Sequence, residues 1–188
     1  MKLKNKIAVI TGGNSGIGLS IAHEFKQNGA KIAILGRDKA TLETAASALG
    51  KDTVAVRGDV RKTADLETLF RKTEERLGKV DIVVANAGIA KFASVQDLSE
   101  EMFDELCDVH FKGAFFTVQK ALPHMRDGGS IILISSSPAQ SRGPAMTSIY
   151  NAAKAAVRSL GRTLATELLP RKIRVNTLSP GLTNTPIL

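Results

Sequence analysis

The fold is decided by residues 7–18, which read IAVITGGNSGIG. The run IAVI has the length and β-branched composition of a buried strand, and the glycines that follow it open a stretch with helical periodicity, Ile17–Gln27. Gly12, Gly16 and Gly18 have the spacing G-x-x-x-G-x-G. Glycine lets the chain turn tightly and approach a pyrophosphate, and the following helix offers free N–H groups at its N-terminus. The pattern predicts a dinucleotide-binding loop; the alternative is a glycine-rich turn without a ligand.

Short apolar runs of the same kind recur along the chain, as IAIL, IVVA and IILI. Because they are apolar throughout, they predict strands buried on both faces, as in a parallel sheet. Two further strands are predicted, one in VAVRGD and one at Ile173–Leu178. The helices predicted between the strands are Ile17–Gln27, Thr41–Leu49, Ala64–Leu77, Glu100–Met125 and Ser148–Leu169. This alternation predicts a three-layer, doubly wound α/β sheet of about six strands in one domain, residues 1–188.

The composition excludes several classes of protein. The chain has 188 residues, one Cys and a formal net charge of +8. A single Cys excludes a disulfide framework and a Cys-based zinc site, and we expect no metal. Apolar runs of four residues are too short to span a membrane, and no signal peptide is evident, so we expect a cytoplasmic protein. Basic residues alternate with acidic ones, which argues against binding to nucleic acid.

The end of the second predicted strand indicates the cofactor. An NAD site places an acidic residue there, about 20 residues beyond the glycine loop, to bind the adenosine ribose. Here the sequence reads Leu35-Gly36-Arg37, and Asp38 is better placed to cap the next helix. A guanidinium at Arg37 suits a 2′-phosphate, so we expect NADP(H) to be preferred over NAD(H). The alternative is that Arg37 is an ordinary surface residue.

A Ser, a Tyr and a Lys follow the fifth predicted strand. Tyr150 and Lys154 are one turn apart on a predicted helix and share a face. An ammonium beside a phenol lowers the phenol's pKa from about 10, so that the phenol can exchange a proton near neutral pH. Ser137, at the end of the strand, could polarise the same substrate oxygen. Taken alone, a Tyr and a Lys one turn apart are more often a surface pair. Together with the glycine loop, Tyr150 and Lys154 predict a catalytic site.

Taken together, these motifs make the chain resemble the short-chain dehydrogenase/reductases, which have a Rossmann fold. The resemblance covers the whole chain. It implies that Tyr150 is the acid/base, that Lys154 lowers its pKa and holds the nicotinamide ribose, and that Ser137 orients the substrate. It also implies hydride transfer between nicotinamide and a ketone or secondary alcohol. The cofactor-binding positions that it implies, together with those of the glycine loop, are Gly12, Asn14, Ser15, Gly16, Ile17, Gly18, Arg37, Asp59, Val60, Asn86, Ala87, Gly88, Tyr150, Lys154, Pro180, Gly181 and Thr185.

Two features depart from the family pattern. His110 stands where many members carry an Asn that holds a water of the proton relay, so His110 either relays protons itself or is a packed core residue. The chain also ends where relatives continue with a substrate lid, a helix and a seventh strand, so it resembles a C-terminally truncated member. The alternative function is therefore a catalytically weak NADP(H)-binding protein. The resemblance implies a homodimer through Glu100–Met125 and Ser148–Leu169.

Overall fold

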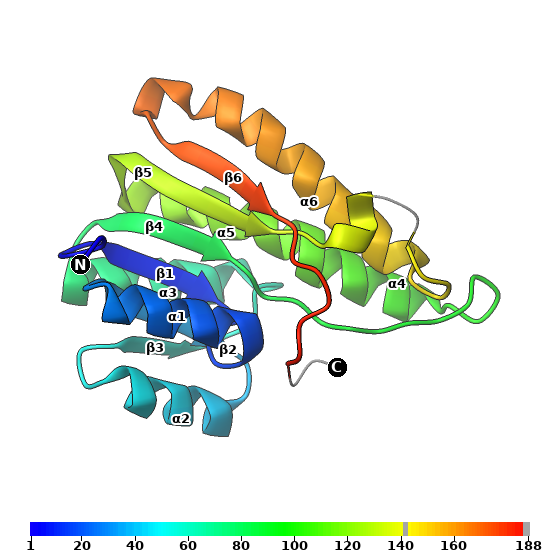
Figure 1. Ribbon diagram of the computed structural model, residues 1–188, viewed down its shortest axis with the longest axis horizontal. Helices are drawn as coiled ribbons and strands as arrows, with labels where there is room; N and C mark the ends of the chain where they lie inside the picture. The colour runs from blue at the N-terminus through cyan, green and yellow to red at the C-terminus, as the bar shows by residue number, and fades with distance from the viewer. Residues whose placement is uncertain (141–142, 186–188) are drawn as a thin grey trace.

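The computed structural model describes residues 1–140 and 143–185, which form a six-stranded sheet flanked by helices (Figure 1). The strand order is β3-β2-β1-β4-β5-β6, and every neighbouring pair is parallel. The predicted doubly wound α/β fold is confirmed. The strands are β1 (Ile7–Thr11), β2 (Lys31–Gly36), β3 (Val54–Arg57), β4 (Val80–Ala85), β5 (Met125–Ile134) and β6 (Arg174–Leu178).

Helices cover both faces of the sheet and enclose two apolar cores (Figure 1). The helices are α1 (Gly16–Gln27), α2 (Lys39–Leu49), α3 (Thr63–Leu77), α4 (Glu100–Cys107), α5 (Gly113–Ala121) and α6 (Ser148–Glu167). Ala22 of α1 and Leu42 of α2 pack in the core on one face, while Phe70 of α3 and Val157 of α6 pack in the core on the other. The central strands β1 and β4 are buried along their whole length, as their apolar runs predict.

Several predicted boundaries are wrong by one or two residues. Helices α1, α2 and α3 begin before the predicted Ile17, Thr41 and Ala64. Strand β6 begins at Arg174 instead of Ile173. At the start of α2, Asp38 accepts a hydrogen bond from the Thr41 amide at 2.8 Å, which confirms its predicted capping role.

The predicted helices Glu100–Met125 and Ser148–Leu169 are too long. The first is interrupted by a π-helical turn at Asp108–Lys112, and after α5 a 3₁₀ turn at Leu122–His124 leads into β5, to which Met125 belongs. Helix α6 ends at Glu167, before a second 3₁₀ turn at Leu169–Arg171. Each 3₁₀ turn contains a proline, which lacks the N–H that an α-helix would need there.

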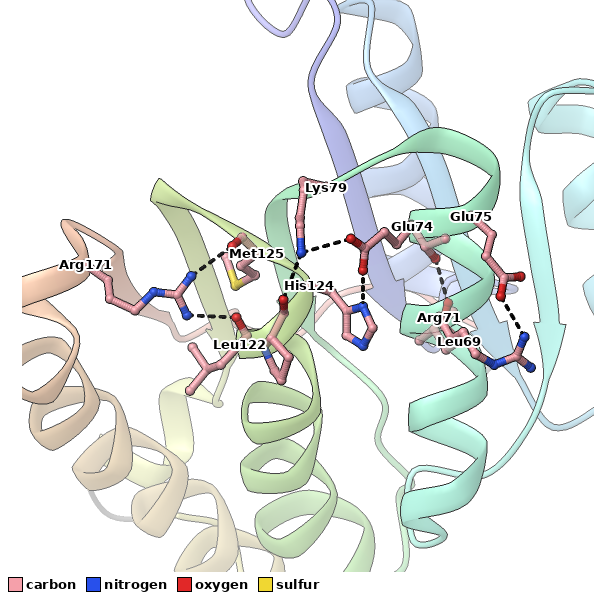
Figure 2. A network of polar contacts seen from close by, with 11 residues as sticks. Leu69, Arg71, Glu74, Glu75, Lys79, Leu122, His124, Met125 and Arg171 are labelled. Carbon is pink, nitrogen blue, oxygen red and sulfur yellow. Dashed lines mark hydrogen bonds and ion pairs between the residues drawn. The ribbon is translucent and has the colours of Figure 1, made fainter.

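A polar network holds these two turns in place (Figure 2). Arg171 donates from its Nη1 to the Leu122 carbonyl at 2.7 Å and from its Nη2 to the Met125 carbonyl at 2.8 Å. Lys79 pairs with Glu74 and donates to the Pro123 carbonyl at 3.0 Å. The network ties the segment before β5 to the connection between α3 and β4. It lies at the amino ends of the strands and leaves the opposite edge of the sheet open.

Candidate functional site

A cavity of about 700 Å³ lies along the carboxyl ends of the strands. In a doubly wound sheet this edge is where ligands bind. The structure brings nearly all of the predicted site residues to the wall of this cavity. They are Gly12, Asn14, Ser15, Gly16, Ile17, Arg37, Asp59, Val60, Asn86, Ala87, Gly88, His110, Ser137, Tyr150, Lys154, Pro180, Gly181 and Thr185.

The glycine loop joins β1 to α1 and forms one wall. Gly12 and Gly16 have φ angles of +65° and +51°, which residues with a side chain rarely adopt. Gly18 is the one predicted cofactor residue that does not line the cavity. A Cβ on Gly18 would lie 2.2 Å from the Gly12 carbonyl oxygen. Its lack of a side chain thus lets α1 pack against the loop.

A side chain at the end of β2 would require Asn14 to move. A Cβ on Gly36 would lie 2.5 Å from the Asn14 side chain, which is held in turn by a 2.8 Å hydrogen bond to the Thr41 hydroxyl. Arg37 follows at the exposed rim. This end of the cavity therefore offers a cation where an NAD site would offer a carboxylate.

Asp59 lies after β3 and is engaged by Arg61. Arg61 donates to Asp59 from its main-chain N–H at 3.0 Å and from its guanidinium at 2.9 and 2.6 Å. Burial acts to raise the pKa of Asp59, but the hydrogen bonds and charge of Arg61, with a smaller effect of Arg37, outweigh it and hold the pKa below its ordinary value. Asp59 is therefore a carboxylate at neutral pH.

Asn86 fastens the end of β4 to the end of β1. Its side-chain amide donates to the carbonyl of Thr11 at 3.0 Å, and its main-chain N–H donates to the Thr11 hydroxyl at 3.1 Å. The Ala87 N–H donates to the same hydroxyl at 3.2 Å. These contacts fix the floor of the cavity between the two central strands.

Tyr150 and Lys154 project from α6 at the other end of the cavity. The Lys154 ammonium is buried and donates to the Ile134 carbonyl at 2.9 Å. Burial lowers its pKa from 10.5 to about 8, so it still carries a charge at neutral pH. Ser137 lies in the same wall, where its main-chain N–H donates to the Pro180 carbonyl at 2.9 Å.

The Tyr150 ring lies between two other rings. His110 meets it edge-on with the ring centroids 5.2 Å apart, and Phe92 does so at 6.1 Å. Such perpendicular contacts are favourable and limit how the Tyr150 ring can turn. The phenol of Tyr150 is therefore held in a defined position, one turn of α6 away from the buried Lys154.

His110 is buried in the π-helical turn with one nitrogen free. Its Nε2 lies 2.8 Å from the Ile89 carbonyl oxygen, so this nitrogen carries the proton and donates. Burial, with a smaller effect of the Lys154 charge, lowers its pKa from 6.5 to about 3. The ring is therefore neutral at physiological pH. Its buried Nδ1 has no hydrogen-bond partner among the described residues, which leaves one acceptor at the cavity wall.

Sequence reasoning missed several residues at this site. Phe92, Ile89, Pro144 and Leu182 also line the cavity. They come from loops without a recognisable motif, and their only signal is that they follow strands or precede Tyr150. Within residues 1–140 and 143–185, no group of three or more His, Cys, Asp or Glu side chains could hold a metal ion. In the same part of the chain, no helix is both long and apolar enough to cross a membrane.

The cavity fits a nicotinamide dinucleotide. Its walls run from Arg37 and Asp59 to Tyr150 and Lys154, and its volume lies within the range of cofactor sites. At the glycine loop, a Cβ on Gly12 would lie 3.0 Å from Ala87, so a side chain there would crowd the end of β4. At the opposite end, polar groups come from the buried Lys154 ammonium and from the Nδ1 of neutral His110, which has no partner within the part of the chain that the structure describes.

Comparison with known proteins identifies the family. The family model described as short chain dehydrogenase matches residues 6–188. Oxidoreductase asL5 of Sarocladium schorii is 42% identical over 188 residues, which are 99% of this chain and 75% of the relative. The NADP-dependent (R)-specific alcohol dehydrogenase of Lentilactobacillus kefiri is 39% identical over 193 residues, with 99% and 76% covered.

Solved structures agree with the sequence comparison. The 3-ketoacyl-(acyl-carrier-protein) reductase from Brucella melitensis, complexed with NADH, superimposes with a TM-score of 0.94 at 37% identity. The match covers 98% of this chain and 79% of that one. The sequence and the fold thus both match a family whose similar members include an NADP-dependent dehydrogenase and a reductase complexed with NADH. The chain belongs to the short-chain dehydrogenase/reductase family.

Proposed function

We propose that the chain is an NADP(H)-dependent oxidoreductase that interconverts a ketone and a secondary alcohol. The observation that carries the proposal is a single cavity with two chemically distinct ends. One end has Arg37 beside Gly36, which stands where an NAD site carries an acidic residue, and the other has Tyr150 one helical turn from the buried Lys154. The first end suits a 2′-phosphate, and the second suits proton exchange with a substrate oxygen.

Tyr150 is the proposed acid/base. Its hydroxyl gives a proton to the carbonyl oxygen in reduction and takes one from the alcohol in oxidation. Lys154 supplies the positive charge that favours the phenolate, and below its pKa of about 8 that charge is present. Ser137, fixed by its bond to the Pro180 carbonyl, donates its hydroxyl hydrogen to the same substrate oxygen.

The remaining predicted residues would hold the cofactor. The glycine loop and the N-terminus of α1 receive the pyrophosphate. The Ser15 hydroxyl makes no capping bond to α1 and is free to contribute. Asp59 and Val60 contact the adenine, and residues 86–88, Pro180, Gly181 and Thr185 line the nicotinamide half. When bound, the nicotinamide supplies or accepts the hydride.

His110 is proposed to take part in proton transfer as a hydrogen-bond acceptor. Its Nε2–H is committed to the Ile89 carbonyl, so Nδ1 is the atom that can receive a hydrogen bond from a water in the cavity. A pKa of about 3 means that it holds such a water without becoming charged. A packed core histidine remains the alternative.

The test uses the fact that the chain has one Tyr and no Trp. The ultraviolet absorbance of ionised tyrosine therefore reports Tyr150 alone. In saturating NADP⁺ we expect the phenol to ionise at lower pH in the native chain than in Lys154→Met. Tyr150→Phe should abolish turnover of a panel of ketones and alcohols and leave the NADPH Kd nearly unchanged, because only the hydroxyl is lost. Binding without turnover in the native chain would instead favour the weakly catalytic NADP(H)-binding protein.

We also propose that residues 1–188 form one domain that assembles as a cytoplasmic homodimer. Phe103, Phe111 and Phe115 lie at intervals of four or eight residues along α4, the π-helical turn and α5, and they are 43%, 41% and 37% exposed. An exposed aromatic stripe of this kind suits a self-complementary interface. Sedimentation equilibrium of the native chain and of Phe103→Glu tests this, since the variant should be monomeric at the same concentration.

A further inference from the structure

Arg57 places a second guanidinium beside Arg37. Arg57 is the last residue of β3 and pairs in register with Gly36, the last residue of β2. Its Nε donates to the Arg37 carbonyl at 3.1 Å, and its side chain is exposed. The two arginines, 20 residues apart in sequence, therefore lie next to each other at the ends of β2 and β3. Arg37 lines the cavity, and Arg57 stands directly behind it, outside the lining.

The charges around this pair leave both guanidiniums available. Among residues 1–140 and 143–185, neither Arg37 nor Arg57 belongs to any ion pair. The nearby carboxylates are otherwise engaged: Asp38 accepts from the Thr41 amide, and Asp59 is bound by Arg61. In this part of the chain neither arginine is therefore neutralised by a salt bridge. The pKa of Asp38 is lowered mainly by hydrogen bonds from Thr41, with a smaller effect of the Arg57 charge.

We infer that Arg57 is a second ligand of the 2′-phosphate of NADP(H), acting with Arg37. The inference rests on the proposed cofactor preference and extends it. With Nε committed to the Arg37 carbonyl, the terminal nitrogens of Arg57 remain as donors in a planar fork that matches a phosphate. The same bond holds the fork next to Arg37, so a phosphate at this rim meets two charges instead of one.

The experiment measures the Kd of NADPH and of NADH by cofactor fluorescence. We expect Arg57→Ala to weaken NADPH binding about tenfold, as for loss of one charged hydrogen bond, and to leave the NADH Kd unchanged. Arg57→Lys should restore part of the NADPH affinity because it returns the charge without the fork. Arg76→Ala, which removes an exposed arginine from the far end of α3, is the matched control.

A double-mutant cycle separates direct contact from positioning. If Arg57 binds the phosphate itself, Arg57→Ala should weaken NADPH binding further in an Arg37→Ala background. If Arg57 only orients Arg37, the second substitution adds nothing, and the inference is overturned. If Arg37→Ala itself leaves the ratio of the two Kd values unchanged, the proposed preference for NADP(H) fails, which is a different result from failure of Arg57 alone.

Discussion

The buried ammonium of Lys154 should make the fold less stable than it would be without it. The side chain is 5% exposed, and its one hydrogen-bond acceptor among the described residues is the Ile134 carbonyl. Burial lowers its pKa from 10.5 to about 8. At neutral pH the Lys154 ammonium is charged in both states, but the charge is less favourable in the folded chain, where it is buried, than in the unfolded chain, where water solvates it.

The size of the effect follows from that pKa. One pKa unit corresponds to about 1.4 kcal/mol, so the folded state is destabilised by about 3 kcal/mol at pH 7. Lys154→Met keeps the length and apolar stem of the side chain and removes the charge. It also loses the bond to the Ile134 carbonyl, which costs about 1 kcal/mol. The variant should therefore unfold with a free energy about 2 kcal/mol higher at pH 7.

The pH dependence identifies the cause. Between the folded pKa of about 8 and the ordinary value of 10.5, the unfolded chain binds a proton at Lys154 that the folded chain does not. Native stability should rise relative to the variant through this interval, until the advantage of Lys154→Met disappears. Urea unfolding of both proteins across the interval measures it, with Lys51→Met as an exposed control. A stability difference that does not change with pH would mean that the buried Lys154 charge is not its cause.

Three further predictions concern the core and the site. Phe70→Ala should lower the free energy of unfolding by about 3–5 kcal/mol because the ring is fully buried, whereas Phe115→Ala at the surface should cost much less; thermal denaturation compares them. Between pH 6.5 and 5 the unfolded chain binds a proton at His110 that the folded chain, with a His110 pKa of about 3, does not bind, so the native protein loses stability as the pH falls. His110→Asn should lose about 2 kcal/mol less over this interval, and equal losses in both proteins would contradict this. Gly36→Asp should weaken NADPH binding more than NADH binding, because the new carboxylate repels a 2′-phosphate, while its Cβ must displace Asn14; cofactor titration measures both.

Helices and strands were predicted well from the sequence where a few neighbouring residues decide them. The strands follow from short apolar runs, and the start of α2 follows from Asp38 as a cap. The prediction was wrong at Glu100–Met125, where a continuous helical period conceals a π-helical turn and the entry into β5. Met125 joins a strand because it pairs with Val80 of β4, and periodicity along one segment cannot report a pairing with another.

Residue types and their spacing were enough to predict the fold class, a dinucleotide-binding loop and the likeness to one enzyme family, because glycine spacing, apolar runs and a Tyr-Lys pair act over a few residues. Other features became visible only in the folded chain. A side chain on Gly18 would meet the Gly12 carbonyl, His110 is neutral with an Nδ1 that has no partner among the described residues, and Arg57 stands beside Arg37. Each of these depends on burial or on strand order. Those properties arise when distant segments meet, so no stretch of sequence contains them.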